Sequence, residues 1–184
     1  MPIQTPICDF GKKALPFELK STENKVISLN DIKGENGTLI MFICNHCPYV
    51  KAITKELVED CSELKKIGIN SVAICSNDFV NYPDDSFENM IKFSNDNHFN
   101  FPYLQDETQE IAKAYDAVCT PDFFGYNKDL GLQYRGRLRE LKNFVPVKDR
   151  ESDLLKAMKQ IAETGKGPQN QIPSAGCGIK WKFD

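Results

Sequence analysis

The order of apolar and polar residues along the chain predicts an α/β fold. Residues 38–44 (TLIMFIC) and 69–75 (INSVAIC) are almost continuously apolar, as expected of strands that are covered on both faces. Between them, apolar residues recur every three or four positions from Val50 onward, which predicts a helix with one buried face that ends at Gly68. A strand, a long crossover and a second strand imply a parallel pair in an α/β sheet.

Smaller elements flank this unit. Residues 17–28 alternate around a polar turn and predict a β-hairpin, and residues 118–127 with 132–138 predict a second, antiparallel hairpin at the sheet edge. Further helices are expected at 84–94, 107–117 and 153–162, with a short strand at 99–106. We therefore expect one domain over residues 1–184, with its core at about 10–162 and an irregular, Gly- and Pro-rich tail at 163–184.

Composition and charge narrow the classes of function. The net charge of -3 provides no basic patch, so nucleic-acid binding is disfavoured. The N-terminal residues show no signal peptide, and the longest apolar run, 38–44, is too short to cross a membrane, so we expect a cytoplasmic protein with no membrane partner. An odd count of seven cysteines without an export signal indicates thiols that are kept reduced.

The segment CNHCPYV, residues 44–50, contains the strongest chemical signal. It places Cys47 after a buried strand and Pro48 in the first turn of the following helix, where a missing N–H is tolerated. Unpaired backbone amides and the helix dipole stabilise a thiolate at such a position. Because the thiolate is the attacking form in disulfide exchange, the position predicts that Cys47 is a nucleophile.

Several of these segments together resemble the thioredoxin fold, a central mixed sheet flanked by helices. They are the N-terminal hairpin, LIMFICNHCPYVK, the crossover helix and VCTPDFF. HCPYV is similar to the active-site motif of glutaredoxins, with Cys47 in the place of the first cysteine of Cys-x-x-Cys and Val50 in the place of the second. The resemblance implies a cis bond between Thr120 and Pro121 that faces Cys47, with Cys119 nearby.

Longer motifs resemble the peroxiredoxin-like group of the alkyl hydroperoxide reductase and thiol-specific antioxidant superfamily. These motifs are NHCPYVKAI, SNDFVNYPDDSFENM, YRGRL and GCGIKWK. The resemblance implies a thiol oxidoreductase or antioxidant without a cofactor, a disulfide or peroxide substrate, and a thiol reductant such as thioredoxin or glutathione. The peroxidatic pattern Pro-x-x-x-Thr-x-x-Cys is absent, because Ile40 and Cys44 stand seven and three positions before Cys47.

The sequence leaves the partner of Cys47 open. Cys119 is favoured by fold position, and Cys177, between two glycines in the tail, is an equal candidate for the resolving thiol. Cys44 is expected to be an ordinary buried strand residue. His46 either raises the thiolate character of Cys47 or is simply a partly exposed neighbour.

Two other functions compete with thiol redox chemistry. Cys44, His46, Cys47 and Cys119 could supply soft ligands to zinc or copper in a metal-binding module. Alternatively, the chain is a scaffold in which Cys47 is buried and unreactive.

The sequence also predicts where four polar residues lie in the fold. Arg135 and Arg137 are expected to be solvated on an edge strand, with the binding of an anion near the site as the alternative. Asn77 and Asp78, after a strand's carboxyl end, are expected on the rim where α/β sheets bind ligands.

Overall fold

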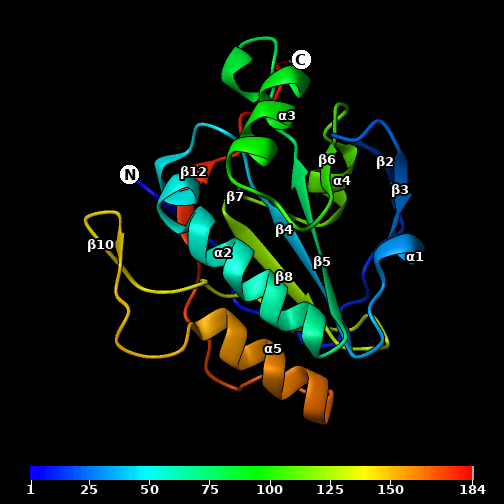
Figure 1. The fold of residues 1–184 in the computed structure, drawn as a ribbon, viewed down its shortest axis with the longest axis vertical. Helices are drawn as coiled ribbons and strands as arrows, with labels where there is room; N and C mark the ends of the chain where they lie inside the picture. The colour runs from blue at the N-terminus through cyan, green and yellow to red at the C-terminus, as the bar shows by residue number, and fades with distance from the viewer. Residues whose placement is uncertain (184) are drawn as a thin grey trace.

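The computed structural model, which describes residues 1–183, has a seven-stranded mixed sheet with the order β3-β2-β6-β5-β4-β8-β9. Helices cover both of its faces (Figure 1). The strands of this sheet are β2 (Glu18–Ser21), β3 (Val26–Ser28), β4 (Gly37–Phe42), β5 (Ile69–Cys75), β6 (Tyr103–Gln105), β8 (Asp122–Tyr126) and β9 (Leu132–Tyr134). The helices are α1 (Leu29–Ile32), α2 (Pro48–Lys66), the short 3-10 helix η1 (Pro83–Asp85), α3 (Phe87–Asp96), α4 (Glu110–Ala114) and α5 (Asp153–Thr164).

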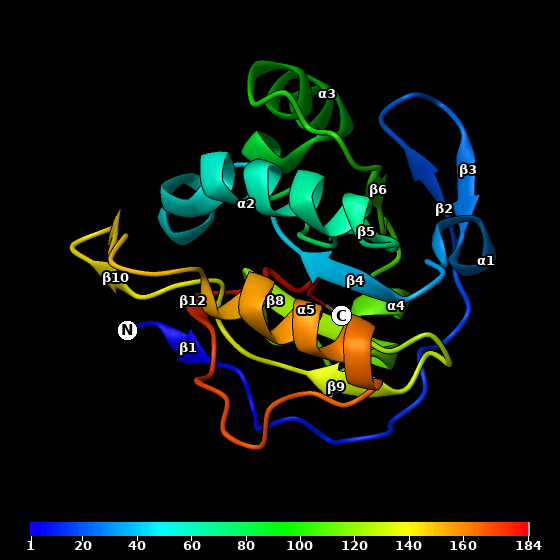
Figure 2. The ribbon, with the colours of Figure 1, turned by 60° about the horizontal axis from the view of Figure 1, so that its bottom comes forward.

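The central strand β4 divides the core into two layers. Its side chains alternate, so that Leu39 and Met41 pack in the cluster under α2 and α5, whereas Ile40 and Phe42 pack in the cluster under α1 and α4. Figure 2 shows α2 and α5 lying across the same side of the sheet. β4 pairs with β5 in parallel, as the continuous apolar runs predict.

Helix α2 follows directly from the sequence pattern. Pro48 occupies its first turn, and the apolar repeat that includes Val50, Ile53 and Leu57 is buried against the sheet. The helix ends before Gly68, which adopts a φ of 82°. The hairpins β2–β3 and β8–β9 also form where the sequence predicts them, and β9 is an edge strand.

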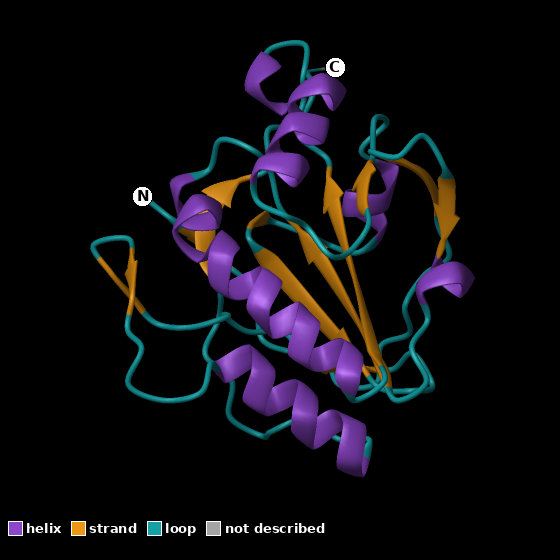
Figure 3. Ribbon diagram, viewed as in Figure 1, coloured by secondary structure: helices purple, strands orange, loops and turns teal. Residues whose placement is uncertain are grey.

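The tail is more ordered than the sequence suggests. It contains the strand β12 (Ala175–Gly178), which lies between β1 (Ile3–Gln4) and β7 (Cys119–Thr120) in a separate three-stranded sheet. Figure 3 shows this small sheet near the start of α2. Sequence patterning misses β12 because two of its four residues are glycines, which have low strand propensity, and because its partners are distant in sequence.

Side chains from the sheet rim hold the tail beyond β12. Asn77 Oδ1 accepts a hydrogen bond from the backbone amide of Lys180 at 2.9 Å, and the amide of Asp78 donates to the carbonyl of Lys180 at 2.8 Å. Gln109 donates to the carbonyls of Ser76 and Lys180. The rim residues Asn77 and Asp78 thus bind the protein's own tail.

A last small hairpin projects from the body. It consists of β10 (Leu141–Lys142) and β11 (Val145–Pro146), and its Phe144 packs edge-on against Tyr49 at a centroid distance of 5.0 Å. Among the helices of residues 1–183, none combines the length and the apolar character needed to cross a membrane.

Candidate active site

Cys47 lies at the N-cap of α2 and is completely buried. Its sulfur is 3.0 Å from the sulfur of Cys177 and 3.2 Å from the carbonyl oxygen of Thr120. Thr120 precedes Pro121 through a cis peptide bond, as the resemblance to thioredoxins implies. Three segments that are distant in sequence therefore meet at one thiol.

Strand pairing brings Cys177 to this position. In the antiparallel β12–β7 pair, Cys177 lies opposite Thr120. The two strands approach so closely that a Cβ atom on Gly176 would lie 1.9 Å from the carbonyl oxygen of Thr120, so a side chain there requires the backbone to shift. Ser174 Oγ donates to the carbonyl of Pro121 at 2.7 Å and fixes the start of the strand.

Cys119, the other candidate resolving thiol, has a different environment. Its sulfur is buried and contacts the carbonyl of Pro121 at 3.7 Å. Burial raises the pKa of Cys119, and Asp122 adds to this effect. The geometry therefore favours Cys177 over Cys119 as the neighbour of Cys47.

Cys44 is buried, as expected, and it also affects the pKa of Cys47. It is buried immediately beyond β4, and its sulfur lies 3.4 Å from Thr120 Oγ1. A hydrogen bond between the two thiols lowers the pKa of Cys47 and raises that of Cys44, so Cys44 is the donor and Cys47 the thiolate. Burial acts against this lowering of the pKa of Cys47, and a hydrogen bond from Cys177 supports it.

The N-terminus of α2 provides one of several hydrogen bonds that lower the pKa of Cys47. Cys47 makes no side-chain capping hydrogen bond, and the backbone amide of Val50 is the smallest of the hydrogen-bond contributions that lower the pKa of Cys47. The carbonyl of Thr120 can accept only from a protonated thiol, so this contact opposes ionisation. Hydrogen bonds from Cys44, Cys177 and the Thr120 side chain therefore act alongside the helix N-terminus to lower the pKa of Cys47.

Cys177 has the opposite character. It is only partly buried, and its pKa is raised, first by burial and then by its hydrogen bond to Cys47. None of the seven cysteines within residues 1–183 is disulfide-bonded. The site thus pairs a buried cysteine of lowered pKa with a partly exposed cysteine of raised pKa.

His46 faces a carboxylate. Its Nδ1 is 2.7 Å from Asp85 Oδ2, although the two groups are not aligned as a hydrogen bond, and its ring stacks on Tyr82. Asp85 is in turn held by the amide of Asn45 and the side-chain amide of Asn77. The hydrogen-bond partners of the Cys47 sulfur are Thr120 and Cys177, and not the neighbouring His46.

The proposed metal ligands do not assemble as a set. Ligand atoms of Cys44, His46 and Asp85 lie within 4.8 Å of one another, whereas the partner of Cys47 is Cys177. The geometry therefore supports redox chemistry better than a metal centre.

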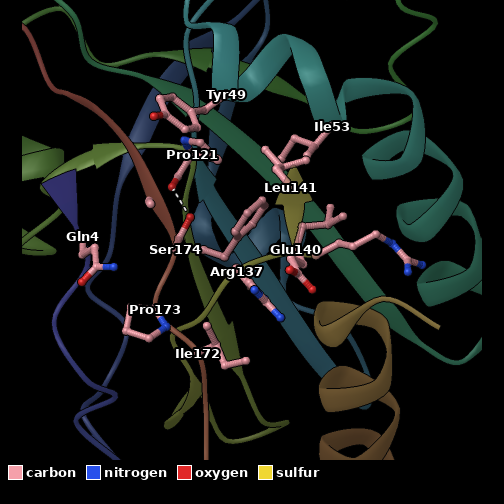
Figure 4. Close-up of a pocket in the computed structure, with 14 residues that line it drawn as sticks. Gln4, Tyr49, Ile53, Pro121, Arg137, Glu140, Leu141, Ile172, Pro173 and Ser174 are labelled. Atoms are coloured by element: carbon pink, nitrogen blue, oxygen red, sulfur yellow. Dashed lines mark hydrogen bonds between the residues drawn. The ribbon is translucent and has the colours of Figure 1, made fainter. Parts of the chain in front are cut away.

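A cavity of about 230 Å³ lies next to the cis-proline segment (Figure 4). Tyr49, two residues after Cys47, and Pro121 lie at one end. Ile53, Phe123 and Leu141 form apolar walls. Arg137 lies on the far side, where its guanidinium pairs with Asp153 at 2.7 Å.

A buried ion pair supports the segment that carries the cis bond. Arg135 is only 6% exposed, and its guanidinium binds both carboxylate oxygens of Asp122, directly after Pro121. The guanidinium also donates to the carbonyl of Asp116. The expectation that Arg135 is solvated was therefore wrong, because its charge is satisfied inside the fold.

Two solved structures resemble this chain over its whole length. An uncharacterized conserved protein from Geobacillus kaustophilus is 44% identical and superposes with a TM-score of 0.93, with coverage of 100% of this chain and 98% of the other. A hypothetical protein from Sinorhizobium meliloti is 31% identical, with a TM-score of 0.91 and full coverage of both chains. No curated protein matches the chain significantly.

More distant structures and a family model define the class. The thioredoxin domain of a thiol-disulfide oxidoreductase from Bacteroides vulgatus is 17% identical, covers 68% of this chain and 86% of its own, and has a TM-score of 0.58, which shows the thioredoxin fold. The model of the AhpC/TSA family matches residues 10–140. With its thiolate and neighbouring thiol at the start of α2, the chain therefore belongs to the AhpC/TSA family of thiol-based redox enzymes.

Proposed function

We propose that the protein is a thiol oxidoreductase in which Cys47 is the nucleophile and Cys177 the resolving thiol. The observation that carries this proposal is the 3.0 Å contact between the two sulfurs, one of which is held as a thiolate. Formation of a disulfide needs the sulfurs to approach to about 2.05 Å, a movement of about 1 Å.

Two substrates fit this chemistry. With a peroxide, the Cys47 thiolate attacks one oxygen, the O–O bond breaks, and an alcohol or water leaves. The Cys177 sulfur then attacks the resulting sulfenic acid, forming the Cys47–Cys177 disulfide and releasing water. With a disulfide substrate, Cys47 forms a mixed disulfide and Cys177 displaces the second thiol. Both cycles oxidise the same pair.

A thiol reductant such as thioredoxin or glutathione must then restore the pair. We propose the cytoplasm as the compartment, because an odd count of seven cysteines is typical of thiols that are kept reduced. The family match supports a disulfide or peroxide substrate in general.

Disulfide mapping tests the proposal. The reduced protein is treated with a small excess of peroxide, remaining thiols are alkylated, and the peptides are mapped by mass spectrometry. We expect a Cys47–Cys177 disulfide, which Cys47→Ser and Cys177→Ser should abolish and Cys119→Ala should leave intact.

Two outcomes would count against the proposal. A Cys47–Cys119 or Cys44–Cys47 disulfide in the wild-type protein would assign the resolving role elsewhere. Cys47 that stays reduced, while the fold remains intact, would favour the scaffold interpretation. Cys61→Ala is a further control, because Cys61 is buried on the sheet-facing side of α2 and takes no part in the proposed cycle.

A further inference from the structure

Gln109 combines two features that are unusual in one residue. It is only 1% exposed, and its backbone has a φ of 67°, in the left-handed region that favours glycine. A residue with a side chain in that conformation raises the free energy of the folded state. Because a glycine at this position would avoid that cost, the presence of a buried glutamine indicates a specific role for its side chain.

The side chain of Gln109 does not stabilise its own helix. Gln109 is the N-cap of α4 and makes no side-chain capping hydrogen bond. Another residue binds the first amides of this helix, since Asp106 accepts from the amides of Ile111 and Ala112 at 3.3 and 2.9 Å. Helix formation therefore leaves the amide group of Gln109 free for other partners.

The hydrogen bonds of this amide group go to backbone atoms of the rim and the tail. Nε2 donates to the carbonyl oxygens of Ser76 at 2.7 Å and Lys180 at 2.9 Å, and Oε1 accepts from the amide of Lys182 at 2.9 Å. Both N–H groups of the side chain are thus used. Gln109 therefore joins the tail to the sheet rim through bonds to two residues of the tail.

The rim itself is a firm support for the tail. Ser76 Oγ donates to Asp106 Oδ2 at 2.7 Å, and both residues are buried. This hydrogen bond joins the loop after β5 to the loop after β6, and Gln109 lies in the second of these loops. The tail is therefore bound to two loops that are already connected to each other.

Asn77 connects the same support to the segment that carries Cys47. Its Oδ1 accepts from the amide of Lys180 at 2.9 Å, and its Nδ2 donates to Asp85 Oδ2 at 2.8 Å. The other carboxylate oxygen of Asp85 accepts from the amide of Asn45 at 2.8 Å, two residues before Cys47. One network of hydrogen bonds therefore reaches both the Cys47 segment and the tail.

The strand that carries Cys177 needs support from outside. Cys177 lies between two glycines in β12, and glycine has the largest backbone freedom of any residue. Neither neighbour of Cys177 has a side chain that could pack and fix the strand. Besides its pairing with β1 and β7, β12 is held at its two ends, where Ser174 binds the carbonyl of Pro121 and the tail binds Gln109.

We propose that Gln109 is a positioning residue, which fixes the tail beyond β12 and so keeps the sulfur of Cys177 at reacting distance from that of Cys47. The inference rests on the proposed function, because it identifies what aligns the resolving thiol. Gln109 acts through the backbone of Lys180, three residues after Cys177. Without its hydrogen bonds, Cys177 should sample positions in which the sulfur contact of 3.0 Å is lost.

Only the resolving step depends on this alignment. Peroxide oxidises the Cys47 thiolate to a sulfenic acid without the participation of Cys177. The Cys177 sulfur then attacks the sulfur of the sulfenic acid, the S–O bond breaks, and the hydroxide takes the thiol proton and leaves as water. We therefore expect loss of the Gln109 side chain to slow the second step and to leave the first unchanged.

Gln109→Gly tests the proposal, because glycine removes the side chain and also relieves the left-handed backbone. The reduced protein is treated with peroxide in the presence of dimedone, which traps sulfenic acids, and the Cys47 peptides are quantified by mass spectrometry. We expect the ratio of trapped Cys47 to Cys47–Cys177 disulfide to rise at least about tenfold over the wild type. The rate at which the Cys47 thiol disappears should stay equal to that of the wild type.

Asn24→Gly is the matched control. Asn24 also has a left-handed backbone, with a φ of 61°, but it is exposed in the turn between β2 and β3. Its replacement by glycine relieves the backbone in the same way and leaves the tail untouched. The ratio of trapped sulfenic acid to disulfide should therefore equal that of the wild type.

Lys182→Pro is a second variant that leaves Gln109 in place. It removes the amide from which Gln109 Oε1 accepts, in an exposed part of the tail, and should raise the ratio at least about threefold. A wild-type ratio in folded Gln109→Gly, or in Lys182→Pro if Gln109→Gly does not fold, would overturn this inference and leave the proposed function intact. Absence of the Cys47–Cys177 disulfide from the oxidised wild-type protein would instead overturn the proposed function.

Discussion

Gly176 offers a direct test of how β12 positions the resolving thiol. Replacement by alanine places a Cβ atom 1.9 Å from the carbonyl oxygen of Thr120 and 2.6 Å from its carbonyl carbon, and both are backbone atoms that cannot rotate away. To restore a separation of at least 3.0 Å, β12 must move away from β7 by about 1 Å. The sulfur contact of 3.0 Å would open by a similar amount, to about 4 Å.

The expected effect is kinetic as well as thermodynamic. A misplacement of about 1 Å between reacting atoms costs about 10- to 100-fold in rate. The strain should also cost about 1–3 kcal/mol in the free energy of unfolding. We expect Gly176→Ala to form the Cys47–Cys177 disulfide at least about tenfold more slowly than the wild type, measured by stopping the reaction with an alkylating agent at intervals after peroxide addition.

A neighbouring glycine provides the matched control. A Cβ atom on Gly178 would lie 2.7 Å from the Cδ1 atom of Ile3, the end of an exposed and flexible side chain that can move. Gly178→Ala should therefore oxidise at nearly the wild-type rate. Wild-type oxidation of a fully folded Gly176→Ala protein would refute the idea that close packing of β12 on β7 aligns the thiols.

Three further predictions concern charge. Cys44→Ala should raise the pKa of Cys47 by about one unit or more, and Cys44→Ser should largely restore it, as measured by the pH dependence of Cys47 alkylation; equal pKa values in all three proteins would contradict the assigned hydrogen bond. Arg135→Met should cost about 3–5 kcal/mol in urea unfolding, because it leaves Asp122 buried and uncompensated; a loss below about 1 kcal/mol would count against this interpretation. Burial raises the pKa of Asp60 to about 6, so its contribution to stability is greatest below about pH 4 and is lost as the pH rises through 6, by up to about 3 kcal/mol. Urea unfolding from pH 4 to 7 should show this loss in the wild type and not in Asp60→Asn; parallel curves would exclude it.

The main sheet could be predicted because its signals are local. Continuous apolar runs mark β4 and β5, and the repeat from Val50 marks α2, each within a single segment of the chain. The position of Cys47 follows from the same local pattern. The cis bond before Pro121 was expected only from the resemblance to thioredoxins.

The remainder of the site depends on contacts between distant residues. β12 carries two glycines and no apolar repeat, so its strand character comes from pairing with β1 and β7. The choice between Cys119 and Cys177 was open in the sequence for that reason. The sequence places Cys44 three residues before Cys47, but the hydrogen bond between them depends on how the chain turns between β4 and α2.

Arg135 shows a second limit of prediction from sequence, which concerns the burial of charged residues. Arginine on an edge strand is ordinarily solvated, and its burial depends on Asp122 thirteen residues earlier. The signal that could have found it is the Asp that directly follows the Thr-Pro pair. Charged residues next to a functional segment therefore merit inspection as internal supports.

The separation of the two site thiols along the chain has an entropic consequence. Cys47 and Cys177 are 130 positions apart, so the proposed disulfide would close a loop that contains most of the molecule. A crosslink of that span lowers the entropy of the unfolded chain enough to stabilise the folded state by about 5 kcal/mol in the chain-entropy account. The stability of the whole domain would then rise when the disulfide forms and fall when it is reduced. The oxidised protein should therefore resist proteolysis more strongly than the reduced one.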